Sequence, residues 1–123
     1  MSEKLARKYF LGQEGVRLGC AQAVAQALKD SFSLDEDFVR SMAQLSGGRA
    51  PSGYCGAIYA ALRVAEEKDP HKKQEIEDFF KREAGGVTCR DVRSKKKLLC
   101  AECVEQAARI LLEGQHSQTK DGA

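Results

Sequence analysis

Five cysteines are the residues of this chain whose side chains could do chemistry. A thiol can form a disulfide, bind a metal or pack as a small apolar group. The two histidines offer no alternative centre, because His71 stands beside two lysines and His116 lies close to the end of the sequence. The cysteines are Cys20, Cys55, Cys89, Cys100 and Cys103.

Three of these cysteines stand where a helix is expected to begin. Cys20 follows Gly19, and Cys55 follows a glycine-rich loop. Cys89 follows Thr88, a residue type that caps helices. Unpaired N–H groups and the positive end of the helix dipole favour an anion there, so we expect a lowered thiol pKa at these positions. For each position taken singly, an inert small residue remains the alternative.

Cys100 and Cys103 form a C-x-x-C pair, which we expect inside the last helix rather than at its start. Residues at i and i+3 can face the same neighbour, so the spacing suits a dithiol or a metal. The strand-then-helix setting of thioredoxin-like motifs is absent, and a zinc ribbon would need a second close pair. Cys100 also lies in the apolar stripe of that helix, where an inert core residue would lie.

Helical periodicity predicts the elements that must position these thiols. A capping box of Ser33 and Glu36 marks one helix start, and Asp69 before Pro70 marks another. No segment alternates with a period of two, so we predict an all-α fold, an irregular bundle of about five helices with short turns. The expected helices cover residues 3–11, start at 20, 34, 55 and 70, and end with one from about 97 to 113.

The helix that starts at Cys55 is expected at the centre of the bundle. It carries little polar surface before Arg63, and its small residues let other helices approach closely. These small faces suit a homodimer as well as the core of a monomer. The small residues are Gly56, Ala57, Ala60 and Ala61.

The length of 123 residues predicts one domain. We expect a single helical cysteine-site domain over residues 1–114. Residues 115–123 carry almost no apolar side chains, so we expect a disordered tail there.

The charge and hydropathy patterns exclude several classes of partner. A net charge of +2 argues against a nucleic-acid binder, and no apolar run approaches the roughly 20 residues of a membrane span, so we expect no membrane insertion. No signal peptide follows Met1, which predicts a cytoplasmic location, where stable disulfides are disfavoured. The basic run from Arg90 to Lys97 is either a solvated connection or a contact for an acidic partner.

Longer stretches around four of the cysteines resemble one protein family. Together, over about Gly15 to Leu112, they are similar to the four-cysteine redox proteins called C_GCAxxG_C_C. The family's CGAxxG motif ends in glycine, where this chain has Ala60, and Cys100 is an additional thiol. The stretches are Gly19–Val24, Cys55–Ala57, Thr88–Arg90, and Cys103–Val104 followed by Ala107–Ala108.

The resemblance implies a small helical bacterial or archaeal protein that is redox-active through its cysteines. The positions that match the family are Cys20, Cys55, Cys89 and Cys103. Related domains accompany haem or iron–sulfur electron carriers, so the resemblance also implies a cluster as an alternative.

The first functional hypothesis is a redox-active thiol protein, and thus a thiol oxidoreductase, that uses dithiol/disulfide or electron-transfer chemistry. Cys55 is the expected attacking thiolate, because the preceding loop leaves access and Arg49 adds positive charge. Cys20, Cys89 or Cys103 would resolve the mixed disulfide. Such chemistry needs a redox partner protein, which the sequence does not identify.

The second hypothesis is a binding module for an iron–sulfur cluster or zinc. Its ligands would be Cys20, Cys55, Cys89 and Cys103, with Cys100 as an accessory thiol. The third hypothesis is a structural or interaction protein whose cysteines are inert. The first two require distant parts of the chain to bring their sulfur atoms together.

Overall fold

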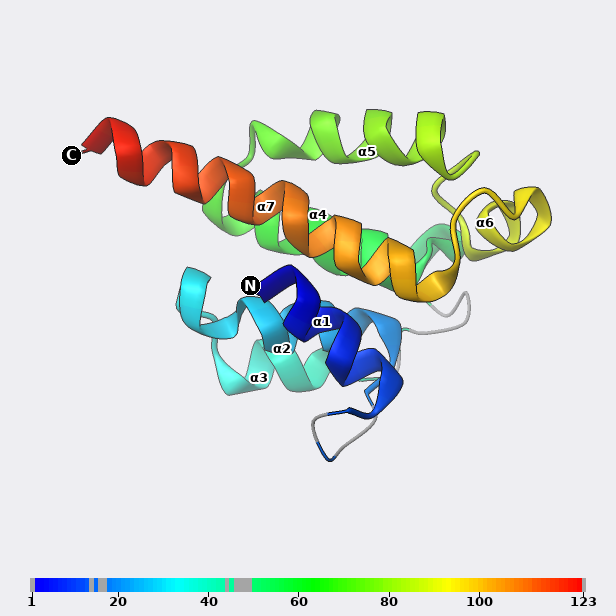
Figure 1. Ribbon diagram of the computed structural model, residues 1–123, viewed down its shortest axis with the longest axis horizontal. Coiled ribbons are helices and arrows are strands. Elements are labelled where there is room, and N and C mark those ends of the chain that lie inside the picture. The colour runs from blue at the N-terminus through cyan, green and yellow to red at the C-terminus, as the bar shows by residue number, and fades with distance from the viewer. Residues whose placement is uncertain (1, 14, 16–17, 44, 46–49, 123) are drawn as a thin grey trace.

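The computed structural model describes residues 2–13, 15, 18–43, 45 and 50–122, and the side chains among them of residues 4–113. These residues form seven α-helices, a short 3-10 turn and no strand. Figure 1 shows how the helices are arranged. The all-α prediction is confirmed, with seven helices instead of about five. The helices are α1 (Ser2–Leu11), α2 (Cys20–Phe32), α3 (Glu36–Ser41), α4 (Gly56–Lys68), α5 (Lys72–Glu83), α6 (Cys89–Lys95) and α7 (Cys100–Gly122), and the 3-10 turn is Pro51–Gly53.

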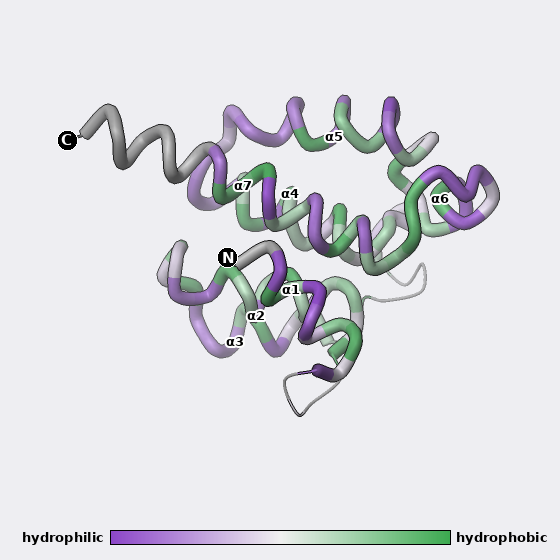
Figure 2. Tube along the Cα trace, viewed as in Figure 1, coloured by the Kyte–Doolittle hydropathy of each residue, from purple (hydrophilic) through white to green (hydrophobic). Residues whose placement is uncertain are grey.

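Helices α2, α4 and α7 pack on one another and form the centre of the bundle. On this centre, α1 covers α2 and α7, α5 covers α4 and α7, and α3 packs against α2. Helix α4 buries its small residues together with Ile58 and Val64, which confirms its expected central place. In Figure 2 the outer helix α5 is mostly hydrophilic, with recurring hydrophobic positions that include the buried Ile76 and Phe80. None of the helices, within the part of the chain described, is long and apolar enough to cross a membrane.

Two of the expected helix starts are wrong. Ser33 ends α2 in a left-handed conformation, with φ of 53°, and its N–H bonds to the carbonyl of Lys29. Helix α3 begins only after Asp35, so the capping box does not form. The backbone N–H of Asp69 likewise bonds to the last turn of α4, and α5 starts at Lys72. In both places the chain must turn directly after a long helix, so the polar residue serves the preceding helix end.

The last helix also differs from the expected one at both ends. Lys96 ends α6 in a left-handed conformation, and α7 begins at Cys100. The carboxylate of Glu102 accepts the N–H of Leu99 at 2.8 Å, which caps this start. The C-x-x-C pair therefore opens α7 and does not lie inside it. The backbone stays helical past Gly114 to Gly122, since one glycine costs a helix only about 1 kcal/mol; the division into a domain and a tail remains a prediction.

Candidate functional site

Three cysteines from three helices meet at one place in the core. Cys20 is the first residue of α2, Cys55 directly precedes α4, and Cys103 lies one turn into α7. The thiol of Cys55 is hydrogen-bonded to both Cys103 and Cys20. The convergence follows from the mutual packing of α2, α4 and α7. We call Cys20, Cys55 and Cys103 the sulfur cluster; none of them is in a disulfide.

Gly56 has no side chain, and this allows the Cys20 sulfur to lie close to the start of α4. A Cβ atom built there would lie 2.6 Å from the Cys20 sulfur and 2.9 Å from the carbonyl oxygen of Leu45. Real Cβ atoms almost never come that close to another atom, so only glycine fits between the starts of α2 and α4. One turn further along, the Cβ of Ala60 is accommodated in the fully buried interior.

The environment of Cys55 raises its pKa to about 12 from an ordinary value of 9.0. The largest cause is its hydrogen bond to Cys103; burial and the electrostatic effect of Cys103 act in the same direction. The hydrogen bond from Cys20 opposes this and favours the Cys55 thiolate. Cys103 is fully buried and Cys55 is 7% exposed, whereas Cys20 is partly exposed.

The two neighbours of Cys55 thus act on its pKa in opposite directions. The hydrogen bond with Cys103 favours the protonated thiol, and the one with Cys20 favours the thiolate. Cys55 lies between the partly exposed Cys20 and the fully buried Cys103 in the sulfur cluster.

Two expectations for Cys55 are wrong. Its pKa is raised, although its position before α4 predicted a lowered one. The backbone N–H of Ile58 does favour the thiolate, without the geometry of a capping hydrogen bond, but the neighbouring sulfur and burial outweigh it. The expected access is also absent, because Cys55 is buried. Arg49, the cation expected beside it, lies outside the described residues. The raised pKa argues against the attacking role expected for Cys55.

Cys89 begins α6 close to the backbone of Cys55. Thr88 caps this helix as predicted, with its hydroxyl oxygen accepting the N–H of Asp91 at 3.1 Å. The N–H of Cys55 bonds to the carbonyl of Val87 at 2.8 Å, and Tyr54 pairs with Thr88 in an antiparallel bridge. The partly exposed thiol of Cys89 makes no hydrogen bond with any other described residue.

The described side chains do not form a metal site. Among them, no group of three or more His, Cys, Asp or Glu residues is arranged to hold a metal ion. Three thiols converge, whereas a cysteine-ligated cluster needs four thiolates. This geometry does not support the expected zinc or iron–sulfur centre.

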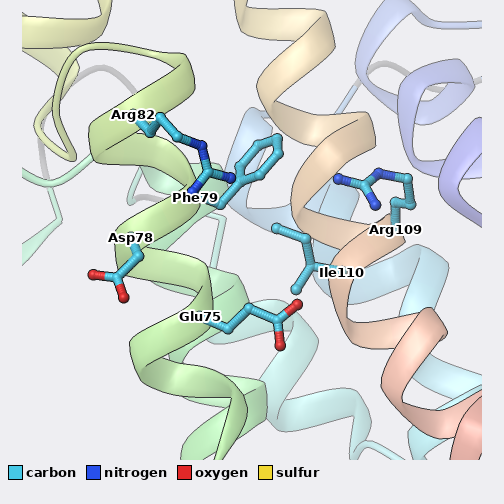
Figure 3. Close-up of a pocket in the computed structure, with 6 residues that line it drawn as sticks. All are labelled: Glu75, Asp78, Phe79, Arg82, Arg109 and Ile110. Atoms are coloured by element: carbon cyan, nitrogen blue, oxygen red, sulfur yellow. The ribbon is translucent and has the colours of Figure 1, made fainter.

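The largest described pocket, about 610 Å³, lies between α5 and α7 and contains no cysteine (Figure 3). Arg109 and Arg82 both stand over the ring of Phe79, at 5.3 and 5.8 Å from its centre. Arg109 is also paired with Glu113 at 2.9 Å. The arginines are thus engaged in packing α5 against α7, and this pocket does not belong to the sulfur cluster.

Sequence reasoning named Gly56 among the small residues that let other helices approach, but did not place it in the site. The available signal was a glycine in the first turn of a predicted helix, where it has no turn to make. Sequence reasoning also expected Cys100 in the core, whereas it is partly exposed at the start of α7.

The fold and the site define a class: a small all-α protein with a chain of hydrogen-bonded thiols in its core. A family model described as "Putative redox-active protein (C_GCAxxG_C_C)" matches residues 18–114. The chain belongs to this family, which confirms the resemblance seen in the sequence, and the match includes all five cysteines. No curated protein and no solved structure matches the chain.

Proposed function

We propose that the protein is a thiol oxidoreductase whose sulfur cluster cycles between thiols and a disulfide. The observation that carries this proposal is the contact of Cys55 with both Cys103 and Cys20. Hydrogen-bonded sulfur atoms need only small side-chain rotations to reach the roughly 2.05 Å of a disulfide bond.

Cys55 occupies the middle of the sulfur cluster and is the resolving thiol of this proposal. It can pair with Cys103 on one side or with Cys20 on the other. In either case two thiols lose two protons and two electrons, and the disulfide of an oxidised partner protein accepts them and becomes two thiols. Cys89 is a second resolving thiol in this proposal, because the Val87 hydrogen bond holds its helix beside Cys55.

Chemical oxidation and disulfide mapping test the proposal. The reduced protein is treated with diamide at neutral pH, remaining thiols are alkylated, and disulfides are assigned by mass spectrometry. We expect a disulfide between Cys55 and Cys103 or Cys20, reversed by dithiothreitol, with the helical circular dichroism signal unchanged. The Cys55→Ser variant should lose it, because Cys55 contributes one sulfur atom to either disulfide.

Cys100→Ser is the matched control, because Cys100 makes no hydrogen bond to the sulfur cluster among the described contacts. It should retain the disulfide. Failure to form any reversible disulfide within the sulfur cluster would overturn the proposal. Stoichiometric zinc or iron in an anaerobic preparation, lost on substitution of the same cysteines, would replace it with the metal-binding alternative.

A further inference from the structure

A second thiol site lies where α6 ends and α7 begins, at one end of the bundle in Figure 1. A pocket of about 280 Å³ opens there, close to the lower end of the usual range for small-ligand sites. Its wall is largely apolar. Leu99 is 68% exposed, which is high for a large apolar side chain. The pocket is lined by Val92, Arg93, Lys96, Leu98, Leu99 and Cys100.

The charge of this pocket is positive. Arg93 and Lys96 are both exposed, and neither side chain forms an ion pair or hydrogen bond with another residue in the described part of the chain. No carboxylate lines the pocket. Of the two that are near in sequence, the side chain of Asp91 lies against Gly86, and Glu102 is engaged by the N–H of Leu99. Two unengaged cations beside an apolar wall favour a small ligand that carries carboxylates.

The thiol in this pocket is one helical turn from the sulfur cluster. Cys100 and Cys103 occupy positions i and i+3 of α7, so helix geometry separates their Cα atoms by about 5 Å. A disulfide accepts Cα separations of about 4.4–6.8 Å. Cys103 in turn is hydrogen-bonded to Cys55. Cys100 is thus a partly exposed thiol in reach of a fully buried one.

We propose that Cys100 exchanges disulfides between a small carboxylate-bearing disulfide in this pocket and the buried thiols. The sulfur of Cys100 attacks one sulfur of the ligand, forms a mixed disulfide and releases one ligand thiol, which takes the proton of Cys100. Cys103 then attacks the Cys100 sulfur and releases the second ligand thiol, which takes the proton of Cys103. Two protein thiols become one disulfide, and one ligand disulfide becomes two thiols.

This inference rests on the proposed function for the onward step from Cys103 to Cys55. It explains why a chain with a buried redox centre carries a fifth cysteine. The pocket gives the reagent a place to bind, and the C-x-x-C pair carries the disulfide inward by one helical turn.

Three disulfides of different charge test the inference on the full-length reduced protein. They are glutathione disulfide, which bears carboxylates, neutral hydroxyethyl disulfide and cationic cystamine. Reactions are quenched with acid over time, and the modified cysteine is identified by mass spectrometry. We expect the first mixed disulfide on Cys100, with glutathione disulfide about tenfold or more faster than cystamine at low salt, and a smaller difference at high salt.

Paired variants separate the pocket from overall charge. The double variant Arg93→Gln/Lys96→Gln should lose the preference for glutathione disulfide. The control Lys8→Gln/Lys81→Gln removes two exposed cations from α1 and α5 and should retain it. Equal rates for cystamine and glutathione disulfide, or a first adduct on Cys20 or Cys89, would overturn the inference.

The inference and the proposed function fail separately in these experiments. If glutathione disulfide oxidises the sulfur cluster of Cys100→Ser as fast as that of the unmodified protein, the inference is wrong, while oxidation by diamide still supports the proposed function. A charge-selective adduct on Cys100 supports the inference even if diamide leaves the buried thiols reduced. Failure of diamide to oxidise the buried thiols counts only against the proposed function.

Discussion

Removal of either neighbour of Cys55 should move its pKa, and the two variants should move it in opposite directions. Cys103→Ala removes the hydrogen-bond partner and the electrostatic effect that raise the Cys55 pKa, so the pKa should fall. Cys20→Ala removes the hydrogen-bond partner that stabilises the Cys55 thiolate, so the pKa should rise. If the substitutions acted only by creating a cavity or loosening the core, the pKa of Cys55 would shift in the same direction in both variants.

The size of the effect follows from the raised pKa itself. A value of about 12 in place of 9.0 lowers the thiolate fraction of Cys55 near neutral pH by about a thousandfold. A hydrogen bond to a charged group contributes about 1.5–3 kcal/mol, so Cys103→Ala should lower the pKa by about one to two pH units. This corresponds to about 10- to 100-fold more thiolate at Cys55.

Carbon-13 NMR of the cysteine Cβ atoms measures these titrations without the need for a reagent to reach the buried sulfur. In the unmodified protein Cys55 should remain protonated through the range in which an exposed thiol titrates. Cys103→Ala should bring its titration to lower pH, and Cys100→Ala should leave it unchanged. An ordinary titration of Cys55 in the unmodified protein, or shifts of the same sign in both variants, would refute the hydrogen-bond chain.

The same pKa predicts a pH dependence of stability. Because the folded pKa of Cys55 lies above the unfolded one, the folded state binds the proton more tightly. The stabilisation is complete below pH 9.0 and is lost as the pH rises towards about 12, at no more than about 1.4 kcal/mol per pH unit. Urea unfolding at increasing pH should show this loss in the unmodified protein and a shallower one in Cys55→Ser.

Two further predictions concern the residues that hold the cysteines in place. Gly56→Ala should cost about 1–3 kcal/mol in urea unfolding and impair disulfide formation at Cys20, because the new Cβ overlaps its sulfur; unchanged stability and oxidation would contradict the close approach. Thr88→Ala should cost about 1 kcal/mol through the lost cap on Asp91, while Thr88→Ser retains most of it. Equal losses in both Thr88 variants would show that the hydroxyl does not act as a cap.

Features that depend on near neighbours in the chain were predictable. Thr88 caps α6, and Cys20, Cys55 and Cys89 all stand at helix starts, because such positions are specified by residues within one turn. The central place of α4 followed from its small apolar residues. Family membership could also be predicted from the sequence, because the cysteine pattern spans most of the chain.

Helix boundaries at tight connections were not predictable in the same way. Ser33 could cap the following helix or end the preceding one, and only the path of the chain between α2 and α3 selects the second. The start of α7 at Cys100 likewise depends on the left-handed turn at Lys96 that closes α6. Because α7 begins at Cys100 and not at about residue 97, the C-x-x-C pair lies in the first turn of the helix and not in its interior.

The amino-acid sequence by itself determined that this is a helical protein of the C_GCAxxG_C_C family with several thiols at helix starts. The tertiary structure alone decided which sulfur atoms meet, and that Cys55 holds its proton. The physical reason is that a helix start acts on a thiol through a few local N–H groups, whereas burial and a neighbouring sulfur from another helix act through packing. In this core the packing between α2, α4 and α7 outweighs the local effect.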